Sequence, residues 1–160
     1  MEKRTIKIDT REQLPWSWRP SDWLAGSETG KLDQGDYCLV GDELGVVAER
    51  KRSVAEIANN LTDKRFGREL DRLKACRYPV VICEFTDADL AAYPAGSDVP
   101  RTRWASLRVK GPFLLRLLAE HQLAHPWVHW AFFAGRERAY EYARCLFKRA
   151  AEAAEAAPRE

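Results

Sequence analysis

The chain has 160 residues, of which 46% are hydrophobic and 31% charged, and its formal net charge is +2. These values fit a single globular domain with a sizeable core, and the net charge is too small to indicate nucleic-acid binding by itself. No apolar run approaches the roughly eighteen residues of a membrane span, so we expect no membrane contact and no secretory leader. Four cysteines without a Cys-x-x-Cys pair indicate reduced, buried thiols, and we expect a cytoplasmic protein.

The first predicted strand covers residues 4–9, where polar and apolar side chains alternate, and it ends in the polar cluster 9–12. Residues 14–24 contain three tryptophans broken by two prolines. They predict a loop that either packs on its own side chains or offers a stacking platform for unpaired bases. Residues 25–34 contain Gly and Ser and predict a connection without regular structure.

A hairpin is predicted next, with strands over 37–40 and 44–48 and a turn at Asp42–Glu43. This register places Asp36 opposite Glu49, and Lys51 projects from the same face as Glu49. Opposed carboxylates are destabilising unless something offsets them, and a hard cation such as Mg²⁺ or Mn²⁺ would do so. The alternative is a solvated salt bridge on an exposed hairpin. The apolar run 46–48 favours the first interpretation, because it suggests a buried strand that delivers charges at its end.

Two helices should follow. The first begins at Ser53 with Glu56 three residues on, which predicts a capping box, and it should end near residue 60. The second, from about 63 to 76, places an apolar stripe beside a basic stripe of Arg65, Arg68 and Arg72. Such a basic face is either solvated or, beside a centre that cleaves phosphodiesters, a track for phosphates.

The second half predicts a central buried strand over 79–85, an irregular segment over 86–105, a helix over 112–122, a buried strand over 127–133 and a helix from 135 to about 156. Arg101, Arg103 and Arg108 form a second basic cluster that could line a DNA groove. Three histidines, at 121, 125 and 129, have ligand-like spacing, but Pro126 interrupts the helix, which favours core or surface positions over a zinc site. No phosphate-binding loop, dinucleotide fingerprint or nucleophile elbow is present.

The order of these elements predicts an α/β fold with a mixed β-sheet and helices on both faces. The motifs Gly35-Asp36-Tyr37 and Glu49-Arg50-Lys51 resemble the signature of the XPF-type nucleases, a branch of the PD-(D/E)XK restriction-endonuclease-like superfamily. The resemblance extends to most of the chain. Asp9-Thr-Arg-Glu12 is similar to the family's Asp-x-Arg-Glu, and the family's acidic residue four after the Lys is Ala55 here, so Glu56 is expected to take that role across a one-residue insertion.

Further likenesses lie in the second helix and near the C-terminus. Arg65-Phe66 resembles the family's Arg-aromatic pair, and Glu69 stands where relatives often carry Gln. Residues 133–136 are similar to the small stand-alone members from phages and bacteria. The resemblance therefore implies one nuclease domain over 1–150 in a bacterial or phage-infected cell, a polar helical tail over 151–160 that frays, and no helix-hairpin-helix domain.

The activity that this resemblance implies is metal-dependent hydrolysis of DNA by an endonuclease with Mg²⁺ or Mn²⁺ as cofactor. Asp36 and Glu49 would hold the cation, and Lys51 would orient water or stabilise developing charge. The remaining candidate residues fall into two groups: Asp9, Glu56 and Arg50 at or beside the catalytic centre, and Arg11, Arg65, Arg68, Arg72 and Arg103 as further DNA contacts, with Arg50 also expected to hold a flanking phosphate.

The expected partners are DNA that is branched or contains single strands and a second copy of the chain, because family members usually pair through this domain. The surface from Trp127 onward is the expected dimer face, although core burial would explain its apolar residues equally well. The competing interpretation is an inactive DNA-binding or scaffold subunit, since the family includes partners that have lost catalysis. The presence of Asp36, Glu49 and Lys51 favours an active enzyme.

Overall fold

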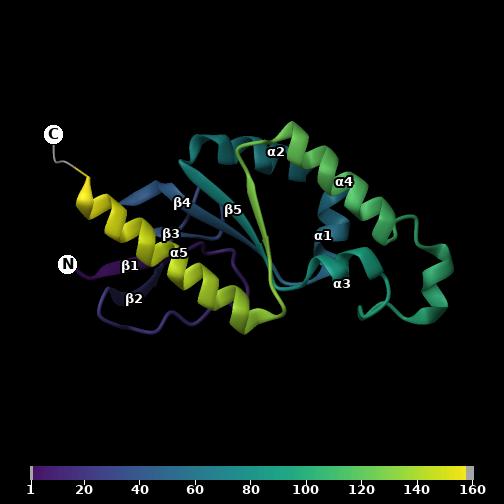
Figure 1. The fold of residues 1–160 in the computed structure, drawn as a ribbon, viewed down its shortest axis with the longest axis horizontal. Helices are drawn as coiled ribbons and strands as arrows, with labels where there is room; N and C mark the ends of the chain where they lie inside the picture. Colours follow the sequence, from purple (N-terminus) through teal and green to yellow (C-terminus); the bar gives the residue numbers. More distant parts are fainter. Residues whose placement is uncertain (1, 158–160) are drawn as a thin grey trace.

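A computed structural model, which describes residues 2–157, shows a six-stranded mixed sheet in the order β2-β1-β3-β4-β5-β6 with helices on both faces (Figure 1). The predicted fold class is confirmed. Strands β4, β5 and β6 are parallel to one another, whereas β3 is antiparallel to both of its neighbours. The strands are β1 (Arg4–Ile8), β2 (Leu24–Thr29), β3 (Tyr37–Leu39), β4 (Asp42–Lys51), β5 (Tyr78–Cys83) and β6 (His129–Phe132).

The helices divide between the two faces because the side chains of β4 and β5 alternate. Val47 and Val81 face one apolar cluster, and Ala48 and Val80 face the other. Helix α5 (Arg136–Ala156) covers the second face and lies across the sheet in Figure 1. The other elements are α1 (Val54–Leu61), α2 (Lys64–Arg72), the 3-10 segment η1 (Leu73–Ala75), α3 (Asp87–Ala92), the 3-10 segment η2 (Arg101–Ser106) and α4 (Gly111–Ala124).

The tryptophan-rich loop packs inside the molecule. Trp16, Trp18 and Trp23 are all buried, and Trp16 stacks on Tyr37 with ring centroids 4.9 Å apart. Trp18 meets Phe147 of α5 at 5.7 Å. Of the two interpretations left open by the sequence, packing is therefore correct, and these rings offer no platform for bases.

Two segments predicted to be irregular contain regular structure. Residues 24–29 form β2, which pairs with β1 at the sheet edge and buries only its first side chain. Residues 87–92 form α3, whose N-cap Thr86 and Asp89 make a complete capping box. Both are short, and one lies at an exposed edge, so neither has the hydrophobic period that identifies a longer element.

The hairpin turn is shifted from its predicted place, yet the register at the other end of the hairpin is correct. The turn is Val40–Gly41 rather than Asp42–Glu43, and Leu39 pairs with Asp42. The register then shifts between Cys38 and Leu39, so that Cys38 pairs with Val47 and residues 43–46 of β4 have no partner in β3. The predicted pairs nearest the turn are wrong, whereas the predicted alignment of Asp36 with Glu49 is retained.

The remaining differences concern burial. Strand β6 is an edge strand with half-exposed or exposed side chains, not the buried strand predicted. Cys145 is exposed, while the other three cysteines are buried and all four are free thiols. His125 lies 3.2 Å from Asp71 and His129 stacks on Tyr78, so the histidines are packing residues. Helix α5 continues to Ala156 with Ala151 buried, and residues 158–160 of the expected tail lie outside the described residues. No helix described here is long and apolar enough to cross a membrane.

Candidate active site

Asp36 is held at the end of the hairpin by its own backbone and by the next strand. Its amide donates to the Ala48 carbonyl at 2.9 Å, and its Oδ2 accepts from the Arg50 amide at 2.7 Å. Gly35 precedes it with φ +70°, and a Cβ there would collide with Val47. Gly35 is therefore required both for the backbone conformation and for the close approach of the two strands, which fixes where the carboxylate points.

Glu49 and Lys51 extend from the end of β4 on one face, as predicted. Lys51 Nζ lies 3.4 Å from Glu49 Oε1 and 3.9 Å from Glu56 Oε1, and it sits 5.2 Å above the centre of the Phe66 ring. Only 6% of the Lys51 side chain is exposed. Burial lowers its pKa, but attraction to Glu49 and Glu56 outweighs burial and the net pKa is raised. Lys51 is thus a fixed, protonated group beside the carboxylates.

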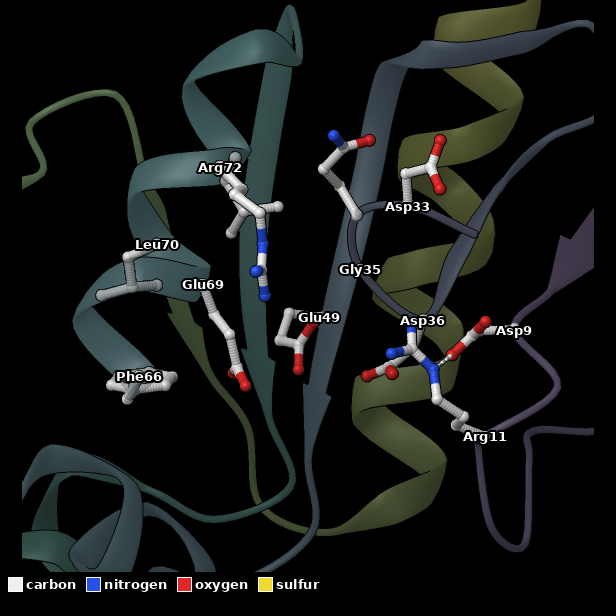
Figure 2. A pocket seen from close by; sticks show the side chains of 12 residues that line it. Asp9, Arg11, Asp33, Gly35, Asp36, Glu49, Phe66, Glu69, Leu70 and Arg72 are labelled. Atoms are coloured by element: carbon white, nitrogen blue, oxygen red, sulfur yellow. Dashed lines mark hydrogen bonds and ion pairs between the residues drawn. The ribbon is translucent and has the colours of Figure 1, made fainter. Parts of the chain in front are cut away.

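A hollow of about 230 Å³ opens above these side chains, between β4 and helix α2 (Figure 2). Asp36 and Glu49 form its floor, and Glu69 of α2 points toward Glu49 from the opposite wall. A second hollow of about 180 Å³ adjoins the same pair of carboxylates and is lined by Glu12, Arg52 and other polar residues. Asp36 and Glu49 are therefore reached from both hollows.

The electrostatics of the pair are unfavourable without a cation. Burial, followed by repulsion from Glu49 and Glu12, raises the pKa of Asp36 well above its usual range. Burial also raises the pKa of Glu49, and repulsion from Glu69 adds to this even though Lys51 opposes it. These carboxylates are placed where ionising both costs free energy, an arrangement that is common at functional sites.

Asp9 is fully engaged in holding the chain together. Its Oδ2 accepts from Arg11 Nε at 2.8 Å, and its Oδ1 accepts from the Leu32 amide at 3.0 Å. Asp9 is buried, whereas the exposed Arg11 reaches over the hollow beside Asp36 (Figure 2). Hydrogen bonding and attraction to Asp9 raise the pKa of Arg11. Asp9 thus positions both Arg11 and the segment before Asp36.

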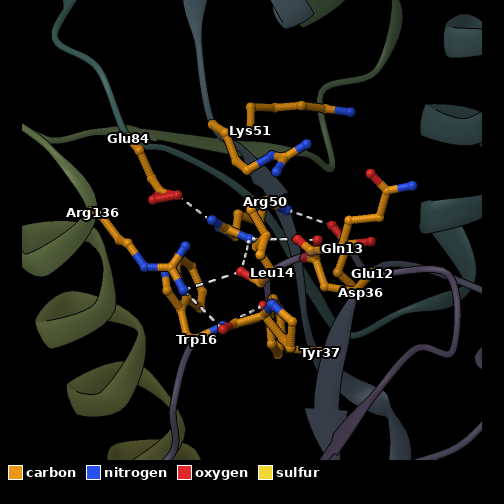
Figure 3. A network of polar contacts seen from close by, with 12 residues as sticks. Glu12, Gln13, Leu14, Trp16, Asp36, Tyr37, Arg50, Lys51, Glu84 and Arg136 are labelled. Atoms are coloured by element: carbon orange, nitrogen blue, oxygen red, sulfur yellow. Dashed lines mark hydrogen bonds and ion pairs between the residues drawn. The ribbon is translucent and has the colours of Figure 1, made fainter.

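Arg50 has a different position from the one expected of a phosphate ligand. Its side chain is 1% exposed, and its Nε donates to Glu84 Oε1 at 2.7 Å. Its Nη1 donates to the Leu14 carbonyl at 2.9 Å and lies 3.5 Å from Glu12 Oε1, while the guanidinium stacks 5.4 Å from the centre of Trp16 (Figure 3). The expectation that Arg50 holds a flanking phosphate is wrong: it lies inside the protein and joins three segments.

Glu56 caps helix α1 and also borders the site. Ser53 Oγ accepts from the Glu56 amide at 3.1 Å, as predicted, but the Glu56 carboxylate accepts from the Arg52 amide rather than from Ser53. Glu56 lies within ion-pair distance of Lys51 and lines the second hollow. Glu56 lines that hollow and Ala55 does not. This position agrees with the prediction that Glu56 takes the place of the family's acidic residue.

The basic residues proposed to contact DNA are not all brought to one place. Arg72 points into the hollow of Figure 2, whereas Arg65 and Arg68 lie on exposed turns of α2 outside its lining. Arg65 is paired with Asp63 at 3.0 Å. Arg103 belongs to η2, in the segment beyond α3, and is not part of either hollow. Only Arg11 and Arg72 therefore stand directly above the carboxylates.

Two residues at the site were not among the predicted site residues. Glu12 is largely buried, its Oε2 has no hydrogen-bond partner within the described chain, and burial raises its pKa. Glu69 faces Glu49 across the hollow. Both positions were visible in the sequence, Glu12 as the last residue of the Asp-x-Arg-Glu motif and Glu69 where relatives often carry Gln. Only the packing of α2 against β4 shows that Glu69 faces Glu49.

The pair Asp36 and Glu49 fits a hard divalent cation. Mg²⁺ is usually held by one or two carboxylates and keeps several waters, and the buried pair with its raised pKa values would be stabilised by such a charge. Within residues 2–157, no group of three or more His, Cys, Asp or Glu side chains is arranged to hold an ion. Water and substrate oxygens would therefore supply the other ligands.

The chain resembles known proteins in both sequence and fold. Residues 8–98 match the ERCC4 domain, and this range contains every residue placed around the two hollows. Among solved structures, XPF from Aeropyrum pernix matches 94% of this chain and 68% of its own length, with a TM-score of 0.61 and 18% sequence identity. At that identity the likeness concerns the fold. A comparison with curated protein sequences finds no match.

Proposed function

The chain belongs to the ERCC4 domain family of nucleases, and from this we propose that it is an endonuclease that hydrolyses DNA phosphodiester bonds with Mg²⁺ or Mn²⁺. The observation that carries the proposal is the meeting of Asp36 and Glu49 at an open hollow, with the buried Lys51 ammonium 3.4 Å from Glu49. An inactive scaffold would not need two neighbouring, partly buried carboxylates whose joint ionisation costs free energy.

Each side chain has a role that follows from its position. Asp36 and Glu49 would hold the cation, which polarises a phosphoryl oxygen and lowers the pKa of a bound water. Lys51 is fixed by Glu49 and Glu56, and it would stabilise the negative charge that develops on the phosphorane oxygens. Arg11 and Arg72 reach the rim of the hollow, where they would hold phosphates on either side of the bond that is cut.

We propose DNA with branches, forks, flaps or single strands as the substrate, in DNA repair, recombination or phage DNA processing. Support comes from the family and from the likeness of residues 133–136 to small stand-alone members. The proposed unit is one nuclease domain, paired with a second copy of the chain. Strand β6 supports pairing, because it is an edge strand whose side chains are at most half-buried, and it lies beside the partly buried Tyr142 and Leu146 of α5.

The test is cleavage of labelled forked, flapped and plain duplex DNA with Mg²⁺ or Mn²⁺, comparing the wild type with Asp36→Asn. We expect cutting that requires the metal, prefers branched substrates and falls by at least about 10²–10³-fold in the variant. Asp22→Asn is the matched control, since Asp22 is exposed and paired with Lys148 away from the hollow. Binding without cutting under either metal would refute the enzyme and favour the inactive DNA-binding subunit.

A further inference from the structure

Residues 94–110, which we call the basic platform, carry a local excess of positive charge. The segment has four Lys or Arg residues and one acid, Asp98, a net charge of +3, whereas the whole chain carries +2. The hollow, by contrast, is bordered by more carboxylates than cations. A polyanion would therefore be attracted to the platform as well as to the basic stretch 64–77, which borders the hollow.

The cations of the basic platform are exposed and free of acidic partners. Its four cations are Arg101, Arg103, Arg108 and Lys110. Within residues 2–157, none of them lies within ion-pair distance of a carboxylate, although many other cations of the chain do. Each is thus available to a phosphate without first breaking an internal pair.

The platform is anchored, so its charges have fixed places. Val99, Leu107 and Val109 pack against the apolar core cluster beneath α1 and α4. The Gly111 amide donates to the Tyr93 carbonyl at 2.8 Å, which closes the two ends of the segment on each other. Within the segment, Trp104 Nε1 donates to the Val99 carbonyl at 2.9 Å. Apolar side chains therefore point inward, and the cations are left outside.

Two neighbouring hollows lie between the platform and the carboxylates. Arg52 lines the second hollow with Asp36 and Glu49. The next residues, 53–55 at the start of α1, line a third hollow of about 230 Å³ together with Glu84, Phe85, Asp89 and residues 95–98 at the root of the platform. Figure 1 shows the segment between α3 and α4 extending past α3, at the end of the molecule away from β1 and β2.

We propose that the basic platform is a second nucleic-acid contact, which binds the phosphate backbone of the duplex arm that leaves the cut site past Arg52. The inference rests on the proposed nuclease function. A phosphate backbone fits better than an acidic protein, because the segment has no exposed large apolar side chain of the kind that anchors protein interfaces. The platform would hold the arm while the hollow receives the scissile phosphate.

The experiment measures equilibrium DNA binding by fluorescence anisotropy across a range of salt concentrations, with Asp36→Asn present in every protein so that DNA is not cut. The platform variant is Arg101→Gln/Arg103→Gln/Arg108→Gln/Lys110→Gln. The matched control, Lys3→Gln/Arg138→Gln/Lys148→Gln/Arg149→Gln, removes the same charge from the segment before β1 and from α5. The forked substrates carry duplex arms of about 10 and about 30 base pairs, which is roughly one and three helical turns.

For the long arm, we expect the platform variant to bind at least about tenfold more weakly, with the slope of log K against log[salt] reduced by about 2–3. The short-arm substrate and the control protein should bind as before. Single variants Arg103→Gln and Arg108→Gln should each reduce the slope by about 1, which provides a second measurement if the fourfold variant folds poorly.

Unchanged affinity and slope in the platform variant would overturn this proposal and leave the nuclease site intact. If the platform variant binds DNA normally but loses binding to polyglutamate, the surface binds an acidic protein and the proposal is also wrong. If the protein with an intact platform binds neither substrate at any salt concentration, the proposed function itself fails, so the two failures are distinguishable.

Discussion

The two faces at the end of strand β4 differ in how far their charged side chains are paired and exposed. Arg50 points into a sealed region where every charge has a partner: Glu84, Glu12 and two backbone carbonyls surround it, and 1% of its side chain is exposed. Glu49, with 19% exposed, points into an open hollow where its neighbours include two more carboxylates. Three consecutive residues of one sequence motif therefore serve two purposes.

The difference shows how this site is kept rigid without closing it. Strand geometry sends alternate side chains to opposite faces, so Arg50 fastens β4 to the loop at Leu14 and to β5 while Glu49 and Lys51 remain on the working side. The buried ion pair of Arg50 and Glu84 thereby determines where Glu49 and Lys51 lie. A functional centre needs such support, because small displacements of its side chains reduce activity.

Disrupting the buried Arg50–Glu84 ion pair should have the largest effect, and the effect should be on stability. Arg50→Met would leave Glu84 buried without its cation, and we expect the free energy of unfolding to fall by about 3–5 kcal/mol. Denaturant unfolding measures this. Arg52→Met is the matched control, since Arg52 is exposed and should cost less than about 0.5 kcal/mol. Equal stability of the two variants would contradict a structural role for Arg50.

Breaking the open side should affect chemistry more than stability. Lys51→Met removes the fixed cation beside the carboxylates, and we expect kcat for DNA cleavage to fall by about 10²–10³-fold with DNA affinity unchanged. Single-turnover cleavage and anisotropy separate the two. Lys74→Met, on an exposed position above the Trp127 ring, should leave both unchanged. A loss of DNA affinity with a normal kcat would show that Lys51 contributes to DNA binding and not to catalysis.

A divalent cation should stabilise the folded protein by binding at Asp36 and Glu49. At a Mn²⁺ concentration about 100 times its dissociation constant, the free energy of unfolding should rise by about 2.7 kcal/mol. Thermal unfolding with and without the metal measures this, and Glu49→Gln should remove most of the increase. The same increase in the variant would show that the ion binds elsewhere.

The smallest effect concerns pH in the absence of a cation. Burial and repulsion from Glu49 raise the pKa of Asp36 in the folded protein. Between the ordinary aspartate pKa and this raised value, the folded state therefore binds more protons than the unfolded state. The free energy of unfolding consequently falls as the pH rises through this range. Asp36→Asn removes this loss and should be about 0.2–1 kcal/mol more stable at neutral pH. Asp22→Asn should show no gain, and destabilisation by Asp36→Asn would contradict the assignment of repulsion.

The motifs near Asp36 could be read from the sequence because their geometry is local. Alternating apolar residues place β3 and β4, and a strand period puts Glu49 and Lys51 on one face. Arg50 could not be interpreted in the same way, because its main partner, Glu84, is 34 residues away and becomes a neighbour only when β5 pairs with β4. The sequence of a motif does not show which face of its strand is buried in the folded protein.

Elements were missed where burial is weak. Strand β2 has one buried side chain and α3 has one, so neither shows a hydrophobic period. The edge position of β6 was also hidden, because its aromatic residues are half-buried against the core and read as a central strand. Glu69 reached the site through the packing of α2, which no local pattern expresses.

The register shift between Cys38 and Leu39 has a practical consequence for engineering. Residues 43–46, which have no partner in β3, separate the two-residue turn from the alignment of Asp36 with Glu49, so the length of the turn and the spacing of the carboxylates are separate variables. Gly41 stands in open space at the tip of that turn, with nothing within 4 Å of where a Cβ would be. A peptide tag or reporter inserted after Gly41 should therefore be tolerated, and it would label the protein near Asp36 and Glu49 without changing their alignment.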